Sequence, residues 1–102
     1  MTVQTSYTFK INPGTDPQTT VESAKRAMAV WRKHRASPKL WSHVWGEVGC
    51  MTVTVEFESY AEYGKCHEAV ATDPDIQAWA RANTQSGSST WIRSGVLREV
   101  PI

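Results

Sequence analysis

The chain has 102 residues, a formal net charge of +1 and 40% hydrophobic residues, a composition typical of one globular domain spanning residues 1–102. Its basic residues form no block, which argues against nucleic acid as a partner. No apolar run approaches the roughly 20 residues that cross a bilayer, so no membrane partner is expected. The N-terminal residues lack the features of a secretion signal, and we expect a cytoplasmic protein.

Two residue types bear on chemistry. Cys50 and Cys66 are not spaced as a redox or zinc pair, so two free, mostly buried thiols are expected, and whether they lie close together stays open. Five tryptophans are many for this length. Tryptophan either fills a core or lines a site for flat apolar ligands.

The first third of the chain predicts a strand and then a helix. Residues 6–12 alternate between apolar and polar side chains, as in a half-buried strand, and the turn sequence "NPGTDP" follows. Apolar residues at helical spacing predict a helix from Val21 to about Arg35, with Thr19 and Glu22 as its capping box. Basic residues fall on the opposite side of this helix, so they are interpreted as a solvated face.

The middle of the chain predicts an antiparallel hairpin. Residues 40–48 and 51–58 both alternate, and a short connection containing Gly49 separates them. In the first strand Trp41, His43 and Trp45 share one face. In the second, "MTVTVEFE", three apolar side chains share a face opposite two threonines and a glutamate.

The last part predicts helical segments and a strand. Ser59 and Glu62 form a capping box, after which Tyr60, Tyr63 and His67 lie along one side of a helix. Pro74 interrupts this helix, Asp73 is expected to cap a short second helical piece, and residues 83–89 are expected to form a polar loop. The final strand covers residues 90–100, with Gly95 as an expected bulge or bend.

The resulting order, β-α-β-β-α-β, predicts a ferredoxin-like α+β fold with a four-stranded antiparallel sheet and helices on one face. The strands carry large side chains on both faces, so the second face needs cover. A partner sheet supplied by a symmetric homodimer is the expected solution.

The segment "WGEVGCMTVTVEFESYAEYGKCHEAVATDPDIQAWARAN", from Trp45 to Asn83, resembles the NIPSNAP-like branch of the dimeric α/β-barrel superfamily. The resembling motifs are "GEVG", "ESYAEYGK" and "DPDIQAW". The resemblance implies a dimer whose two sheets form a barrel, with a pocket in each protomer between sheet and helices. Relatives by fold include cofactor-free monooxygenases of aromatic polyketides, cyclases, isomerases and heme-degrading enzymes, whereas many NIPSNAP-like members have no assigned reaction.

Two histidines are candidate general bases. His67 could act with a hydroxyl of Tyr60 or Tyr63 as hydrogen-bond donor, or be a half-buried core histidine without a catalytic role. His43 lies between two indoles on a strand, which suits an aromatic ligand, but also suits packing under the first helix or in a dimer interface. The candidate substrate-binding residues are Trp41, Trp45, Trp31, Trp79, Trp91 and Arg93. For Arg93 a salt bridge to Glu56 or Glu47 is the preferred alternative.

The leading hypothesis is a cofactor-independent enzyme, an oxygenase or a cyclase/isomerase, acting on a hydrophobic aromatic or polyketide-like small molecule. The alternatives are a non-catalytic ligand-binding or stress-associated protein, and heme binding or degradation with His34 or His67 as axial ligand. No metal site is expected, because Cys50, Cys66, His43 and His67 show no recognised ligand spacing.

Overall fold

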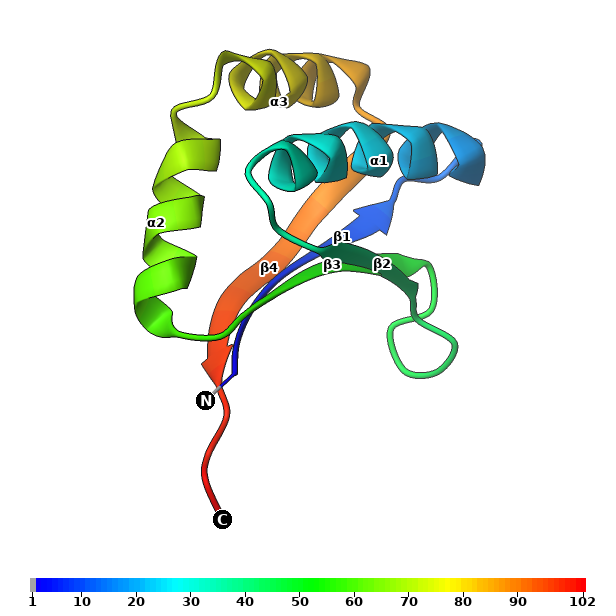
Figure 1. Cartoon of the computed structure of the whole chain (residues 1–102). Coiled ribbons are helices and arrows are strands. Elements are labelled where there is room, and N and C mark those ends of the chain that lie inside the picture. The colour runs from blue at the N-terminus through cyan, green and yellow to red at the C-terminus, as the bar shows by residue number, and fades with distance from the viewer. Residues whose placement is uncertain (1) are drawn as a thin grey trace.

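The computed structural model describes residues 2–102 and contains one four-stranded sheet and three helices (Figure 1). The elements follow the order β1 (Val3–Ile11), α1 (Pro17–Lys33), β2 (Pro38–Ser42), β3 (Cys50–Phe57), α2 (Tyr60–Ala71), α3 (Pro74–Ser86) and β4 (Ser89–Arg98). The strand order is β2-β3-β1-β4 and every neighbouring pair is antiparallel. This confirms the predicted ferredoxin-like α+β fold, in which α2 and α3 together occupy the second helical position.

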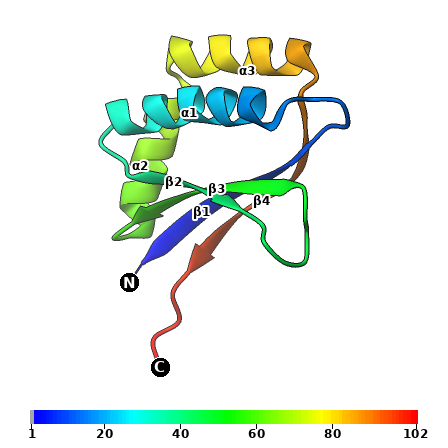
Figure 2. The ribbon, with the colours of Figure 1, turned by 90° about the vertical axis from the view of Figure 1, so that its right-hand side faces the viewer.

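The helices lie on one side of the sheet, with α1 and α3 side by side and α2 running across the end of α1 (Figures 1 and 2). The core fills the space between the layers. Its buried members come from one face of β3 and from the inner sides of α1 and α2, and they are Ala24, Met28, Val30, Trp31, Val53, Val55 and Val70. No helix within residues 2–102 is long and apolar enough to cross a membrane.

The helix starts follow local capping chemistry. Ser59 accepts a hydrogen bond from the backbone N–H of Glu62 at 3.1 Å, and Asp73 caps α3, as the sequence predicts. The predicted start of the first helix is wrong. Asp16 is the cap of α1 and Pro17 its first residue, so the helix begins one turn before Val21 and the Thr19–Glu22 capping box is not used.

Two further predicted boundaries and the predicted position of one strand irregularity are wrong. The strand predicted over 40–48 ends at Ser42, and a loop containing Gly46 and Gly49, at φ of +84° and +89°, leads into β3. The loop predicted over 83–89 is helical as far as Ser86, where Gly87 ends α3 in a left-handed conformation. The irregularity in β4 lies between Trp91 and Arg93 rather than at Gly95.

Candidate functional site

A cavity of about 290 Å³ lies between the sheet and the three helices. One wall of the cavity is aromatic. It is formed by residues of β1, α1, α3 and β4, namely Tyr7, Phe9, Trp31, Trp79 and Trp91. The ring of Tyr7 stands at the centre of this wall, with ring centroids 6.2 Å from Trp31 and 5.6 Å from Trp91. Such a wall suits a flat, largely apolar ligand.

Small side chains create the space. On α1, Ala24 and Ala27 line the cavity one turn apart, and on α2 the consecutive residues Val70 and Ala71 line it. Larger residues at these positions would bring side chains into the volume that is now empty. The cavity is at the lower limit of the roughly 300–1,000 Å³ typical of small-molecule sites, so it fits a ligand of two or three rings.

A polar cluster lies where α1 meets α3. The indole N–H of Trp79 donates to the backbone oxygen of Ser23 at 2.8 Å and to its hydroxyl at 3.1 Å, and that hydroxyl donates to Asn83 Oδ1 at 2.9 Å. Thr20, one turn before Ser23, is 2% exposed and its Oγ1 has no partner among residues 2–102. Leaving a buried hydroxyl unpaired costs roughly 1–3 kcal/mol. Thr20, Ser23 and Asn83 were not among the candidates from the sequence.

His67 lines the cavity from α2 and is itself exposed, which places it at the cavity mouth. Its ring centroid lies 5.5 Å from that of Tyr63, so the predicted alignment of these two side chains is confirmed. Tyr63 and Tyr60, however, do not line the cavity. Tyr7 does, and burial raises the pKa of its phenol, so its hydroxyl stays protonated and able to donate at neutral pH.

His43 and Trp41 lie on the opposite face of the sheet. His43 Nε2 is 2.7 Å from Thr52 Oγ1, and the indole N–H of Trp41 donates to Thr54 at 2.6 Å. Thr52 and Thr54 flank Val53 in β3, and neighbouring residues of a strand point to opposite faces. The structure therefore separates His43 from His67, and Trp41 with His43 forms a shallow hollow of its own.

Trp45 and Arg93 also lie outside the cavity. The predicted strand position of Trp45 is wrong, because it sits in the loop after β2 and is 90% exposed. The Arg93 guanidinium binds the Glu47 carboxylate through two nitrogens, one of them at 2.8 Å, and its position opposite Thr8 places it on the open sheet face. The predicted salt bridge to Glu47 is confirmed, and Arg93 lowers the pKa of that carboxyl.

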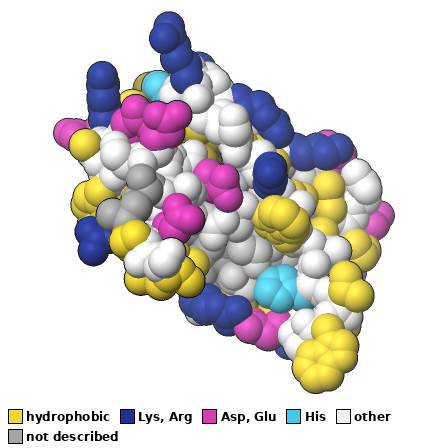
Figure 3. Space-filling model, turned by 60° about the horizontal axis from the view of Figure 1, so that its bottom comes forward, with side chains coloured by type: hydrophobic (Ala, Val, Ile, Leu, Met, Phe, Trp, Pro, Cys, Tyr) yellow, Lys and Arg dark blue, Asp and Glu magenta, His cyan; other side chains and the backbone are white. Residues whose placement is uncertain are grey.

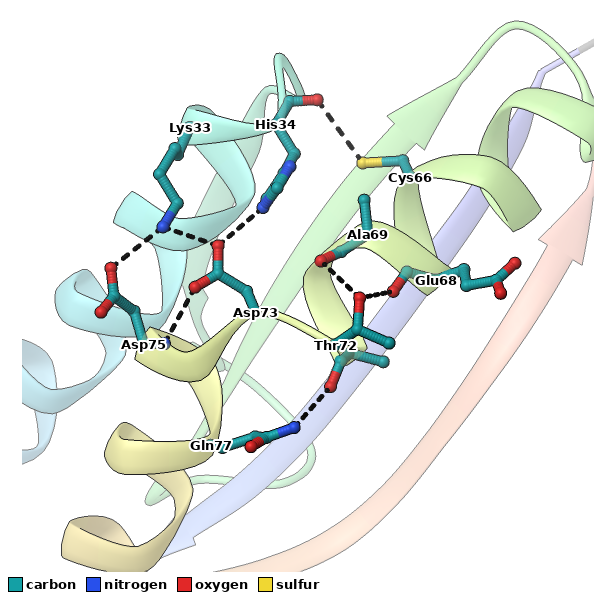
Figure 4. A network of polar contacts seen from close by, with 10 residues as sticks. Lys33, His34, Cys66, Glu68, Ala69, Thr72, Asp73, Asp75 and Gln77 are labelled. Atoms are coloured by element: carbon teal, nitrogen blue, oxygen red, sulfur yellow. Dashed lines mark hydrogen bonds and ion pairs between the residues drawn. The ribbon is translucent and has the colours of Figure 1, made fainter.

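Ionic contacts hold the helices around the cavity (Figure 4). Asp73 lies between α2 and α3, and its carboxylate contacts two residues at the end of α1. Lys33 Nζ is 2.6 Å away and His34 Nε2 is 2.8 Å away. Lys33 also reaches Asp75 at 2.9 Å. Hydrogen bonds from Lys33, from the backbone N–H of Asp75 and from His34 keep the pKa of Asp73 well below its ordinary value. The ring of His34 is thus engaged outside the cavity.

The two cysteines are free thiols. Cys50 is buried, and Cys66 is half-buried with its sulfur 3.7 Å from the carbonyl oxygen of His34. Burial raises the pKa of Cys66, which lowers its nucleophilicity at neutral pH. Among residues 2–102 there is no group of three His, Cys, Asp or Glu side chains that could hold a metal ion.

Solved structures share this architecture. An uncharacterized NIPSNAP domain protein from Burkholderia xenovorans has a TM-score of 0.73 at 17% identity, over 100% of this chain and 95% of that one. A NIPSNAP family protein from Agrobacterium tumefaciens has a TM-score of 0.75 at 12% identity, over 100% and 94%. SnoaB, a cofactor-independent oxygenase from Streptomyces nogalater, has a TM-score of 0.73 at 12% identity, over 99% and 95%.

No protein-family model and no curated protein matches the sequence. The structural matches confirm the resemblance inferred from the sequence at the level of the fold. The chain has the ferredoxin-like α/β fold of the NIPSNAP domain proteins and of the oxygenase SnoaB.

Proposed function

We propose that this protein is a small cofactor-independent enzyme that acts on an aromatic or polyketide-like molecule in the cavity between sheet and helices. The observation that supports this most is the combination of an aromatic wall with a histidine at the cavity mouth. The shared fold with a cofactor-independent oxygenase is compatible with it.

The chemistry follows from the groups that line the cavity. The imidazole of His67 removes a proton from a ring CH₂ that is conjugated through the aromatic rings with a carbonyl group, and the protonated Tyr7 hydroxyl is available to stabilise the enolate oxygen. In the oxygenase reaction the carbanion reduces molecular oxygen, so that a ring CH₂ and O₂ give a ring C=O and H₂O. In a cyclase or isomerase the same first proton transfer is followed by ring closure or double-bond migration.

Trp31, Trp79 and Trp91 hold the substrate in this proposal, since all three line the cavity. The other candidates from the sequence have different places. Tyr60 and Tyr63 pack beside His67 at the edge of α2, and His43, Trp41, Trp45 and Arg93 lie outside the cavity.

The protein is also proposed to be a homodimer. Trp41 and Leu97 on the open sheet face are 51% and 61% exposed, and the loop after β2 adds Val44, Trp45 and Val48. Figure 3 shows hydrophobic side chains in two groups on the lower surface of the molecule, with acidic side chains between them. A second copy packed on this face would cover the exposed apolar surface.

The test is oxygen uptake with anthrone, a tricyclic aromatic ketone with an acidic ring CH₂. We expect wild-type protein to accelerate oxygen consumption, and His67→Ala to lower kcat by roughly 10²–10⁴-fold. His43→Ala is the matched control and should leave kcat unchanged, because His43 lies across the sheet. Equal turnover in the two variants and the wild type would show that His67 is not the general base.

A ligand carrier is the second candidate, since the cavity would serve a carrier equally well. Saturable binding of aromatic ketones without any product, over a range of such compounds, would favour it over the enzyme. Heme binding through His34 has less support, because His34 is engaged by Asp73 and does not line the cavity, which leaves His67 as the candidate axial ligand. The cytoplasmic location stays a prediction from the sequence.

A further inference from the structure

The opening of the cavity is bordered by α2 and β4. Among the described residues that line the cavity, those exposed to solvent are His67 and Ala71 on α2 and Trp91 on β4. His67 and Ala71 lie one turn apart and so share one side of their helix. Trp91 is the largest side chain of this group, so it has the greatest influence on what passes through the opening.

A bulge in β4 places Trp91 on the cavity side of the sheet. Phe9 lies opposite Trp91 and Thr8 lies opposite Arg93, so Ile92 is an extra residue in β4. In a regular strand, residues 91 and 93 would share one face. Across the bulge they do not, because Arg93 lies on the open sheet face whereas Trp91 lines the cavity.

The indole of Trp91 extends from the cavity interior to the protein surface. Its ring meets the ring of Tyr7 edge-on, with the centroids 5.6 Å apart and the planes at 69°. Trp91 is nevertheless 59% exposed, compared with 6% for Trp31, the other aromatic neighbour of Tyr7. A side chain that touches both the central ring of the aromatic wall and the solvent stands in the opening itself. β4 is also an edge strand, so no further strand of this chain covers it.

We infer that Trp91 is a specificity-determining residue, which limits the ligand to three linearly fused rings. This inference rests on the proposed function and narrows its substrate class. A flat three-ring ligand takes up the cavity of about 290 Å³, so a fourth ring in line has to enter the opening where the indole stands. The indole would have to leave its contact with Tyr7, which costs packing and ring–ring attraction.

The experiment compares two ketones that differ by one ring. Anthrone has three fused rings, and tetracen-5(12H)-one has the same ketone and ring CH₂ with a fourth ring fused in line. Dissociation constants are measured under argon by quenching of tryptophan fluorescence, for which Trp31 and Trp79 remain as reporters in the Trp91 variants. Trp91→Val removes the indole and suits a strand, whereas Trp91→Phe keeps a smaller ring. Trp41→Val is the matched control, because Trp41 lies in β2 on the open sheet face.

We expect wild-type protein to bind anthrone at least about tenfold more tightly than the four-ring ketone. A site without a limit on length would show the reverse preference, because the extra ring buries more apolar surface. Trp91→Val should bind the four-ring ketone at least about tenfold more tightly than wild type does. It should bind anthrone about two- to tenfold more weakly, because the ring contact is lost. Trp91→Phe should give an intermediate ratio of the two constants, and Trp41→Val the wild-type ratio.

The other outcomes separate this inference from the proposed function. If Trp91→Val weakens both ketones by the same factor, Trp91 only holds the ligand and the inference is wrong. If wild-type protein binds the four-ring ketone as tightly as anthrone, the inference is wrong and the proposed function stands. If wild-type protein binds neither ketone, both fail. If Trp91→Val melts well below wild type, Trp91→Phe decides, and a wild-type ratio in that variant contradicts the inference.

Discussion

Filling the cavity from α1 should make the protein more stable and unable to bind its ligand. Ala27 lines the cavity, and Ala27→Leu adds three carbon atoms there. If each takes about the 30 Å³ of a water molecule, the side chain fills on the order of 90 Å³, or about a third of the 290 Å³. A ligand of two or three rings no longer fits, so its affinity should fall by at least about tenfold.

The stability gain can be worked out from the same three carbons. Their burial contributes about 0.8 kcal/mol each, and the loss of leucine rotamer freedom opposes this by roughly 0.5–1 kcal/mol. The free energy of unfolding should therefore rise by about 1.5 kcal/mol, which raises the melting temperature by roughly 6–12 °C in a domain of this size. Urea unfolding and a thermal melt measure both quantities.

Ala29→Leu is the matched control, because Ala29 lies on the exposed side of the same helix. It has the same change in helix propensity and should alter neither stability nor binding. Overpacking of a closed core would instead lower the free energy of unfolding of Ala27→Leu by about 1–3 kcal/mol and leave ligand affinity intact. That result would show that the space beside Ala27 is not open and would refute the cavity as described.

Two further predictions concern charge and assembly. The depressed pKa of Asp73 adds stability that is complete above the ordinary carboxyl pKa of 3.8 and is lost as the pH falls below it. Asp73→Asn should therefore lower the melting temperature at neutral pH and flatten its fall as the pH drops below about 4, whereas Asp75→Asn, at an exposed position, should change the melting temperature less. Parallel curves of melting temperature against pH for wild type and Asp73→Asn would contradict this. Trp41→Glu places a charge on the open sheet face and should convert a dimer to a monomer in light scattering, whereas Arg26→Glu on the exposed side of α1 should not. A monomeric wild type would contradict the proposed dimer.

The fold was largely predictable because its signals are local. Alternation in "MTVTVEFE" and the caps at Ser59 and Asp73 depend on residues close in sequence, and all three predictions are confirmed. The errors came from glycines and from a stronger competing cap. Asp16 followed by proline outcompetes Thr19. β2 ends at Ser42, and the loop with the left-handed Gly46 and Gly49 includes Trp45, so the alternating pattern continues beyond the strand.

The site was predictable only in part because it depends on which faces meet. Trp31, Trp79, Trp91 and His67 do line the cavity, whereas His43 and Trp41 belong to the other face of the sheet. When both faces of a short strand carry large side chains, its own residues do not determine which face points toward the helices. Thr20, Ser23, Ala24 and Ala27 fall on one side of α1, and this run of small residues on a buried helix face is the signal that could have indicated a cavity.

The five tryptophans allow a direct test of the central claim, that the ligand site is the cavity between sheet and helices. Their indole N–H signals can be followed in a ¹H–¹⁵N NMR titration with anthrone under argon, after assignment by single Trp→Phe variants. We expect shifts at Trp31, Trp79 and Trp91, which line the cavity, and unchanged signals at Trp41 and Trp45. Shifts confined to Trp41 and Trp45 would place the ligand on the open face of the sheet and contradict the account.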